Sequence, residues 1–127
     1  MSAYTLVNFR ETPDDAAAHG MGEVLEAHFP REQLGCERIG VSLQRIKPGQ
    51  RMPFGHAHKT DEEVYVVLSG GGTVRIDGEE RELRPMDALR VAPATQRAFA
   101  AGPEGLELLA FGTHHDDDVV MDPAPWG

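Results

Sequence analysis

The sequence predicts a single all-β domain, a barrel or sandwich built from short antiparallel strands. Three observations carry this prediction. Short apolar and β-branched runs begin at Ile39, glycine and proline separate these runs, and helical periodicity is scarce. Turn signals at intervals of about eight to twelve residues are typical of sandwiches and barrels and not of alternating helix and strand units. A length of 127 residues fits one hydrophobic core.

The first 35 residues carry the helical signals of the chain. Thr12 is a candidate N-cap for a short helix over Pro13–Ala18, which the glycines that follow would end. A single helical turn is expected over Pro30–Leu34, because Gly35 can close it in a left-handed conformation. We therefore predict that residues 1–35 form a short N-terminal helical extension that packs on the barrel.

Residues 36–112 are predicted to form the barrel itself. Asp77-Gly78 marks the clearest turn, because glycine tolerates the positive φ that a tight antiparallel hairpin needs. Runs of strand length flank this turn and continue on both sides of it. The strands that we expect are Ile39–Ile46, Glu63–Leu68, Gly72–Ile76, Glu80–Leu83, Ala88–Val91, Gln96–Ala100 and Leu106–Phe111.

Residues 113–127 are predicted to form an acidic C-terminal tail in solvent. The segment contains Asp116-Asp117-Asp118 and ends in a run with two prolines. The alternative is that Val119, Val120 and Trp126 dock on the barrel or on a second subunit, because these side chains are apolar.

Charge and cysteine content exclude several function classes. With 12 basic and 21 acidic residues the net charge is −9, which argues against nucleic acid and anionic membrane surfaces as partners. The single cysteine, Cys36, excludes an internal disulfide framework. The chain shows no long apolar run or secretory leader, so we expect a cytoplasmic protein.

The most informative segment contains two histidines and a glutamate. In an extended chain His56 and His58 point to the same face, about 6 to 7 Å apart, and Glu63 begins the next strand. Two imidazoles and one carboxylate are the minimal set that holds iron, manganese or a similar divalent ion with coordination positions left open. The alternative is that both histidines are ordinary hydrogen-bonded residues of the barrel.

This segment resembles the first motif of the cupin superfamily. The residues that fill the motif are Gly49, His56, His58, Glu63 and Gly70. Only the gap between Gly49 and His56 departs, with six residues where five are usual. The resemblance implies a jelly-roll barrel, the cupin double-stranded β-helix, that binds a small molecule and often forms a homodimer.

The stretch from Met86 to Arg97 is similar to the second cupin motif, with three departures. Met86 and Ala94 stand where the family has glycine, and Arg97 stands for the histidine that is the fourth metal ligand. A guanidinium carries only donors and stays protonated, so Arg97 cannot coordinate a cation.

Two interpretations remain open at this point. In the first, His56, His58 and Glu63 still hold one divalent ion (Fe, Mn, Ni or Zn), and Arg97 at the pocket rim pairs with an anionic substrate. In the second, Arg97 occupies the vacated ligand position and pairs with Glu63, which leaves a centre without metal.

Three further residues are candidates for substrate binding, although each also suits plain barrel core: Tyr65, Phe99 and Gln44. The function that we predict is a small-molecule cupin, as a metal-dependent oxygenase or isomerase of the kinds that the family includes. The alternative is a metal-free ligand-binding or sensor cupin. A purely structural or interaction role is a third hypothesis. The sequence assigns no catalytic residue and no substrate.

Overall fold

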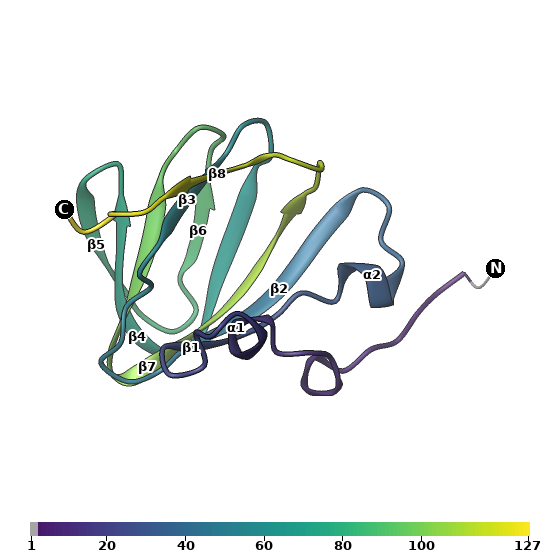
Figure 1. The fold of residues 1–127 in the computed structure, drawn as a ribbon, viewed down its shortest axis with the longest axis horizontal. Coiled ribbons are helices and arrows are strands. Elements are labelled where there is room, and N and C mark those ends of the chain that lie inside the picture. Colours follow the sequence, from purple (N-terminus) through teal and green to yellow (C-terminus); the bar gives the residue numbers. More distant parts are fainter. Residues whose placement is uncertain (1–2) are drawn as a thin grey trace.

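The computed structural model describes residues 3–127, and nearly half of these residues lie in strands of one sheet. The sheet curls on itself into a barrel, with the N-terminal segment along one side (Figure 1). The chain order of its strands is β1 (Leu25–His28), β2 (Ile39–Ile46), β3 (Gly55–His58), β4 (Glu63–Ile76), β5 (Glu79–Leu83), β6 (Ala88–Val91), β7 (Arg97–Thr113) and β8 (Val119–Asp122). The all-β jelly-roll prediction is therefore confirmed.

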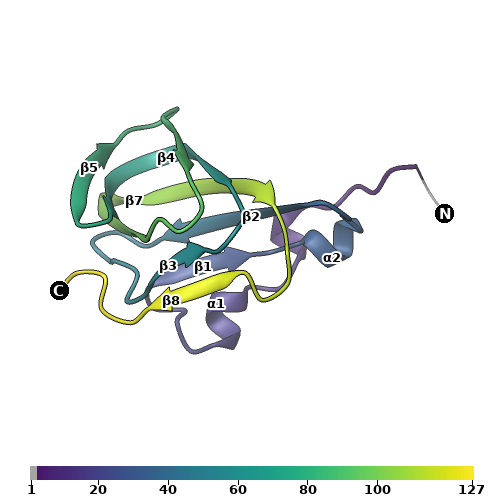
Figure 2. The ribbon, with the colours of Figure 1, turned by 90° about the horizontal axis from the view of Figure 1, so that it is seen from above.

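The strands pair as one eight-stranded antiparallel sheet within residues 3–127. One path through it runs β1-β2-β7-β3-β8, and β4 pairs with β5, β6 and β7. Seen from above, the strands surround an interior and β8 lies beside β3 at the edge (Figure 2). None of the helices in this part of the chain has the length and apolar character needed to cross a membrane.

Two long strands, β4 and β7, pair with each other along most of their lengths. Each of them contains two of the shorter strands predicted above. The gaps predicted between Leu68 and Gly72 and between Ala100 and Leu106 are wrong, because β4 continues through two register shifts and β7 is unbroken. Gly70 has a φ of 73°, and a Cβ there would lie 2.0 Å from the carbonyl oxygen of Gly105. Glycine is thus needed where the two backbones cross closely and bend.

Tight turns elsewhere keep the positions that the sequence predicts. Asp77 and Gly78 both have positive φ and join β4 to β5 as an antiparallel hairpin. Met86 and Ala94, which stand for two family glycines, also have positive φ, at 74° and 65°. The backbone therefore keeps a left-handed conformation at these two positions of the second motif, although the glycines that adopt it without strain are absent there.

The N-terminal extension consists of a 3₁₀ turn (Phe9–Glu11), α1 (Asp15–Ala18), β1 and α2 (Arg31–Leu34). Asp14, and not Thr12, caps α1, because its carboxylate accepts from the backbone N–H groups of Ala16 and Ala17. Gly35 closes α2 with a left-handed φ of 73°, as predicted. Strand β1 was missed from the sequence; it pairs with β2 and extends the sheet.

The C-terminal segment docks on the barrel through β8 and Trp126, although most of its side chains, Val119 and Val120 among them, remain exposed. Strand β8 pairs with β3 in register, with Val119 opposite His58. The indole Nε1 of Trp126 donates to the carbonyl oxygen of Met52 at 2.8 Å. The docking that we considered as the alternative is therefore the observed state for Trp126 and β8.

The core fills the interior of the barrel away from the histidines. Its members are apolar side chains that alternate along β4 and β7 and point inward. Each such side chain contributes about 1.5–3 kcal/mol when it is withdrawn from water. The most deeply buried are Ile46, Tyr65, Val67, Val74, Val91, Phe99, Leu106 and Leu108.

Candidate functional site

Two neighbouring strands bring together the three residues that the first motif predicts. His56 and His58 alternate with Gly55 and Ala57 on β3, so both imidazoles lie on the same face of the strand, where they line one cavity. Glu63 is the first residue of β4. The imidazole rings lie edge to face, with centroids 5.2 Å apart.

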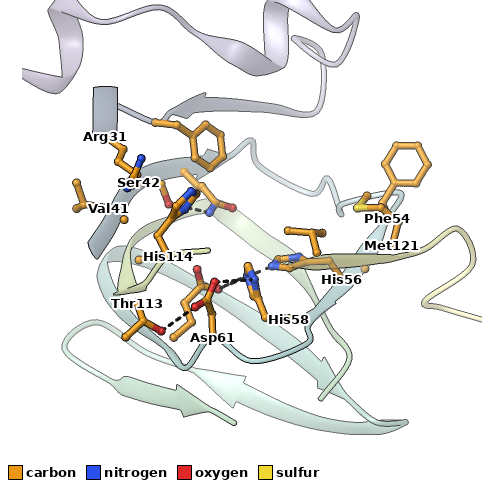
Figure 3. A pocket seen from close by; sticks show the side chains of 18 of the residues that line it. Arg31, Val41, Ser42, Phe54, His56, His58, Asp61, Thr113, His114 and Met121 are labelled. Atoms are coloured by element: carbon orange, nitrogen blue, oxygen red, sulfur yellow. Dashed lines mark hydrogen bonds and ion pairs between the residues drawn. The ribbon is translucent and has the colours of Figure 1, made fainter. Parts of the chain in front are cut away.

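Both imidazoles converge on one oxygen of Glu63. The Nε2 atom of His56 lies 3.8 Å from Oε1 of Glu63, and the Nε2 atom of His58 lies 3.9 Å from the same oxygen. Figure 3 shows the two histidines side by side, with Asp61 close to His58. The three side chains therefore form one polar centre and are not separate core residues.

Arg97 completes this centre from β7. It lies directly opposite His56 in the β3–β7 pairing, and its side chain is fully buried. Its Nη2 donates to Oε1 of Glu63 at 2.8 Å, and its Nε donates to the Tyr65 hydroxyl at 3.2 Å. Its Nη1 donates to the carbonyl oxygen of Thr95 at 3.0 Å. The guanidinium therefore uses each of its three nitrogens within the protein.

Arg97 does not stand at the rim of the pocket, where the first of the two interpretations places it. Arg97 is absent from the lining of the cavity that His56, His58 and Glu63 face, among the residues that the structure describes. Its pairing with Glu63 is the arrangement that the second interpretation requires. Tyr65 and Phe99 are also buried core residues away from the cavity wall, with ring centroids 4.7 Å apart. Gln44 does line the cavity.

Several neighbours together keep Glu63 ionised. Burial alone would raise the pKa of the Glu63 carboxyl. The polar contacts with His56, Tyr65 and Arg97, together with the positive charge of Arg97, outweigh this and lower the pKa to about 2. Burial lowers the pKa of His58, against the opposing effect of Glu63. The centre is thus an ionised carboxylate beside an imidazole that burial keeps neutral.

Two further carboxylates, neither of which the histidine motif of the sequence indicates, lie beside His58 on the side away from Glu63. Asp118 Oδ2 lies 3.4 Å from Nδ1 of His58, and Asp61 Oδ2 lies 3.9 Å from the same nitrogen. The Asp61 and Asp118 side chains are only 3% and 5% exposed. Burial opposes ionisation of Asp118, but hydrogen bonds from Thr60 and from the Asp61 N–H lower its pKa below the ordinary range.

A cavity of about 460 Å³ opens in front of the centre. Its polar end holds His56, His58, Asp61 and Glu63, with His114 and His115 nearby. Figure 3 shows Phe54 and Met121 together at one end of the cavity. Most of the wall is apolar, formed by Met21, Leu25, Phe29, Val41, Met52, Phe54, Val119 and Met121.

His56, His58 and Glu63 could hold a divalent metal ion, because their donor atoms all lie within 4.8 Å of one another. The environment fits an ion only in part. The oxygen of Glu63 that faces both imidazoles already accepts from Arg97, and that guanidinium offers donors where a fourth ligand would offer a lone pair.

The fold and this centre define a double-stranded β-helix protein with a polar site for a small molecule. The family model for the cupin domain matches residues 42–112, and the chain belongs to this family.

Known proteins in the same family show the range of its members. The chain is 37% identical over 84 residues to the dimethylsulfoniopropionate lyase DddW of Ruegeria pomeroyi, covering 65% of this chain and 49% of that protein. It therefore spans about half the length of this relative. A cupin protein (BF4112) from Bacteroides fragilis matches in structure with a TM-score of 0.73 and 27% identity, over 92% of this chain and 89% of that one.

The polyketide cyclase RemF from Streptomyces resistomycificus is also similar in structure. Its TM-score is 0.72 at 16% identity, over 91% of this chain and 82% of that one. At this identity the likeness supports the fold alone.

Proposed function

We propose that this chain is a small-molecule cupin whose centre works without a bound metal, because Arg97 takes the place of the fourth ligand. The observation that carries the proposal is the 2.8 Å contact between Arg97 Nη2 and Glu63 Oε1, with the guanidinium fully buried. Glu63 already has a full positive charge as its partner, and therefore needs no cation to offset its own charge.

A divalent ion beside Arg97 would meet strong repulsion. A charge of +2 about 5 Å from a guanidinium, at an effective dielectric constant near 20, is opposed by about 7 kcal/mol. The ion would have to share Oε1 of Glu63 with Arg97 or displace the guanidinium from it. Displacement would leave a buried cation without its partner, which is itself costly.

The cavity indicates the chemistry of the ligand. Its apolar wall suits an apolar body, and its polar end offers the imidazoles of His56 and His58 beside the carboxylates of Glu63 and Asp61. Arg97 already donates to Tyr65, Thr95 and Glu63, which supports a ligand that does not pair with this guanidinium. We propose a ligand with a hydrogen-bond-donating group, such as a hydroxyl or amine, at the histidines.

A neutral imidazole and an ionised carboxylate in such a cavity suit proton transfer to or from a bound molecule. Isomerisation is the reaction kind that we favour, with His56 and His58 touching the ligand and Arg97 holding the carboxylate ionised. The relative DddW is named as a lyase, a class whose bond-breaking steps also move protons, which is consistent with this proposal.

Two measurements test this proposal: the metal content of the parent protein and the metal affinity of a variant that is designed to bind metal. Protein purified without chelator is expected to carry far less than one equivalent of Fe, Mn, Ni or Zn. Arg97→His restores an imidazole at the ligand position and is expected to raise Zn²⁺ affinity at least tenfold, measured by calorimetry. His56→Ala in the Arg97→His background should remove the gain. Near-stoichiometric metal in the parent that His56→Ala abolishes would contradict the proposal.

Such a result would instead support a second candidate function, that of a metal-dependent oxygenase or isomerase. The observation that favours it is the convergence of both Nε2 atoms on one carboxylate oxygen. A metal held by His56, His58 and Glu63 would supply Lewis-acid or oxygen-activating chemistry.

A homodimer and a cytoplasmic location remain predictions. Light scattering on the purified protein and cell fractionation test them.

A further inference from the structure

We infer that Asp118 is a positioning residue that sets the tautomer of His58, so that Nε2 of His58 presents a lone pair to the cavity. The inference deepens the proposed function and rests on it only in taking His58 as part of the ligand-facing centre. It concerns the neutral imidazole, and it holds for a centre with or without a metal.

Nδ1 of His58 needs an acceptor. This nitrogen is buried and makes no hydrogen bond of good geometry with any residue between 3 and 127. The nearest charged oxygens are those of Asp118 at 3.4 Å and Asp61 at 3.9 Å. A proton on Nδ1 therefore lies close to carboxylate oxygens and is favoured by their negative charge, whereas a lone pair there would be repelled by it.

Asp118 is held in place by donors from the loop between β3 and β4. Its Oδ1 accepts from the Thr60 hydroxyl at 2.6 Å and from the Thr60 N–H at 3.1 Å. Its Oδ2, the oxygen close to His58, accepts from the Asp61 N–H at 2.9 Å. These bonds fix the carboxylate relative to the imidazole, because the loop begins directly after His58.

The same bonds argue against a second cation site at this cluster. His58, Asp61 and Asp118 have ligand atoms within 4.8 Å of one another. However, Asp61 accepts from the His115 N–H at 3.0 Å and from the Thr113 hydroxyl at 2.9 Å, so both carboxylates already face protein donors. The cluster therefore supports His58 from behind and does not bind an ion of its own.

The consequence lies on the other side of the ring. With the proton on Nδ1, Nε2 is an acceptor, and it faces Oε1 of Glu63 across 3.9 Å. Two acceptors at that separation leave a place for a donor from the ligand between them. With the other tautomer, Nε2–H would itself donate toward Glu63 and fill that place. Asp118 thus determines which group the ligand must bring.

The experiment is nitrogen-15 NMR of the imidazole rings at a pH where they are neutral. Long-range proton–nitrogen correlations distinguish a protonated from an unprotonated ring nitrogen, and the His58 signals are assigned by their loss in His58→Gln. The parent is expected to have Nδ1–H as the majority form. In Asp118→Ala the majority is expected to change to Nε2–H.

Two variants separate positioning from general loosening of the loop. Thr60→Val removes a hydroxyl bond to Asp118 but leaves the carboxylate beside His58, so Nδ1–H should remain the majority. Asp118→Asn keeps an oxygen that can accept from Nδ1–H and should rescue the parent pattern.

Three outcomes would overturn the inference: Nε2–H as the majority in the parent, an unchanged tautomer in folded Asp118→Ala, or the same change in Thr60→Val. The parent measurement decides even where Asp118→Ala does not fold. Metal content in the parent tests the proposed function separately and does not enter this result.

Discussion

Glu63, which is partly exposed, and Asp118, which is buried, are two carboxylates on opposite sides of His58, and they are stabilised in different ways. Glu63 is 21% exposed and pairs with a cation, Arg97, at 2.8 Å. Asp118 is 5% exposed and accepts from backbone N–H groups and the Thr60 hydroxyl. An ion pair leaves a bare charge when one partner is lost, whereas a set of neutral donors loses only one bond at a time. The two sides should therefore respond very differently to substitution.

The largest effect is expected for Arg97→Met, which removes the cation and leaves Glu63 buried without a partner. We expect the free energy of unfolding to fall by about 3–5 kcal/mol in urea denaturation. The double variant Glu63→Gln/Arg97→Met should recover most of this loss, because no uncompensated charge remains. Equal stability of the single and double variants would show that Arg97 acts through packing alone.

The ion pair should also make the free energy of unfolding depend on pH in the acidic range. The pKa of Glu63 is about 2 in the folded protein against an ordinary 4.5, so folding favours the ionised carboxylate. Its contribution is present above the pKa of the unfolded chain and is lost as the pH falls from about 4.5 toward 2, on the order of 3 kcal/mol. Glu63→Gln should reduce the slope of unfolding free energy against pH in this window. An unchanged slope would assign the acid sensitivity to other groups.

The smallest effect is expected on the Asp118 side. Thr60→Val removes one hydroxyl donor and leaves the backbone donors in place, so the loss should be about 1 kcal/mol. The control is Thr95→Val, because the Thr95 hydroxyl makes only a long 3.5 Å contact to a carbonyl in an exposed turn. A loss for Thr60→Val as large as for Arg97→Met would end the distinction between the two carboxylates.

The centre was predictable from the sequence because its geometry is local. His56 and His58 share a face by strand alternation, and Glu63 follows after one short loop. Asp118 could not be found in this way, since it reaches Thr60 and Asp61 from 58 and 57 positions away, respectively. Three consecutive aspartates in an acidic tail indicate solvent exposure, and nothing local distinguishes the third one.

The same difference between local and long-range interactions separates the parts of the fold that the sequence predicts from those that it does not. The hairpin at Asp77-Gly78 is fixed by its own two residues and was predicted correctly. The segments around Gly70 and Gly102 were expected to separate strands, although they belong to continuous strands whose backbones approach closely there. Their role depends on a contact between distant segments, which a single sequence does not reveal.

The end of the chain has a consequence for how members of this fold diverge. Val119 and Met121 of β8 line the cavity, and Asp118 immediately before them stands behind His58. A few substitutions in this terminal segment can therefore reshape both the wall and the hydrogen-bonding character of the pocket while the histidine motif stays intact. Proteins with identical motif residues but different last strands should accordingly select different small molecules.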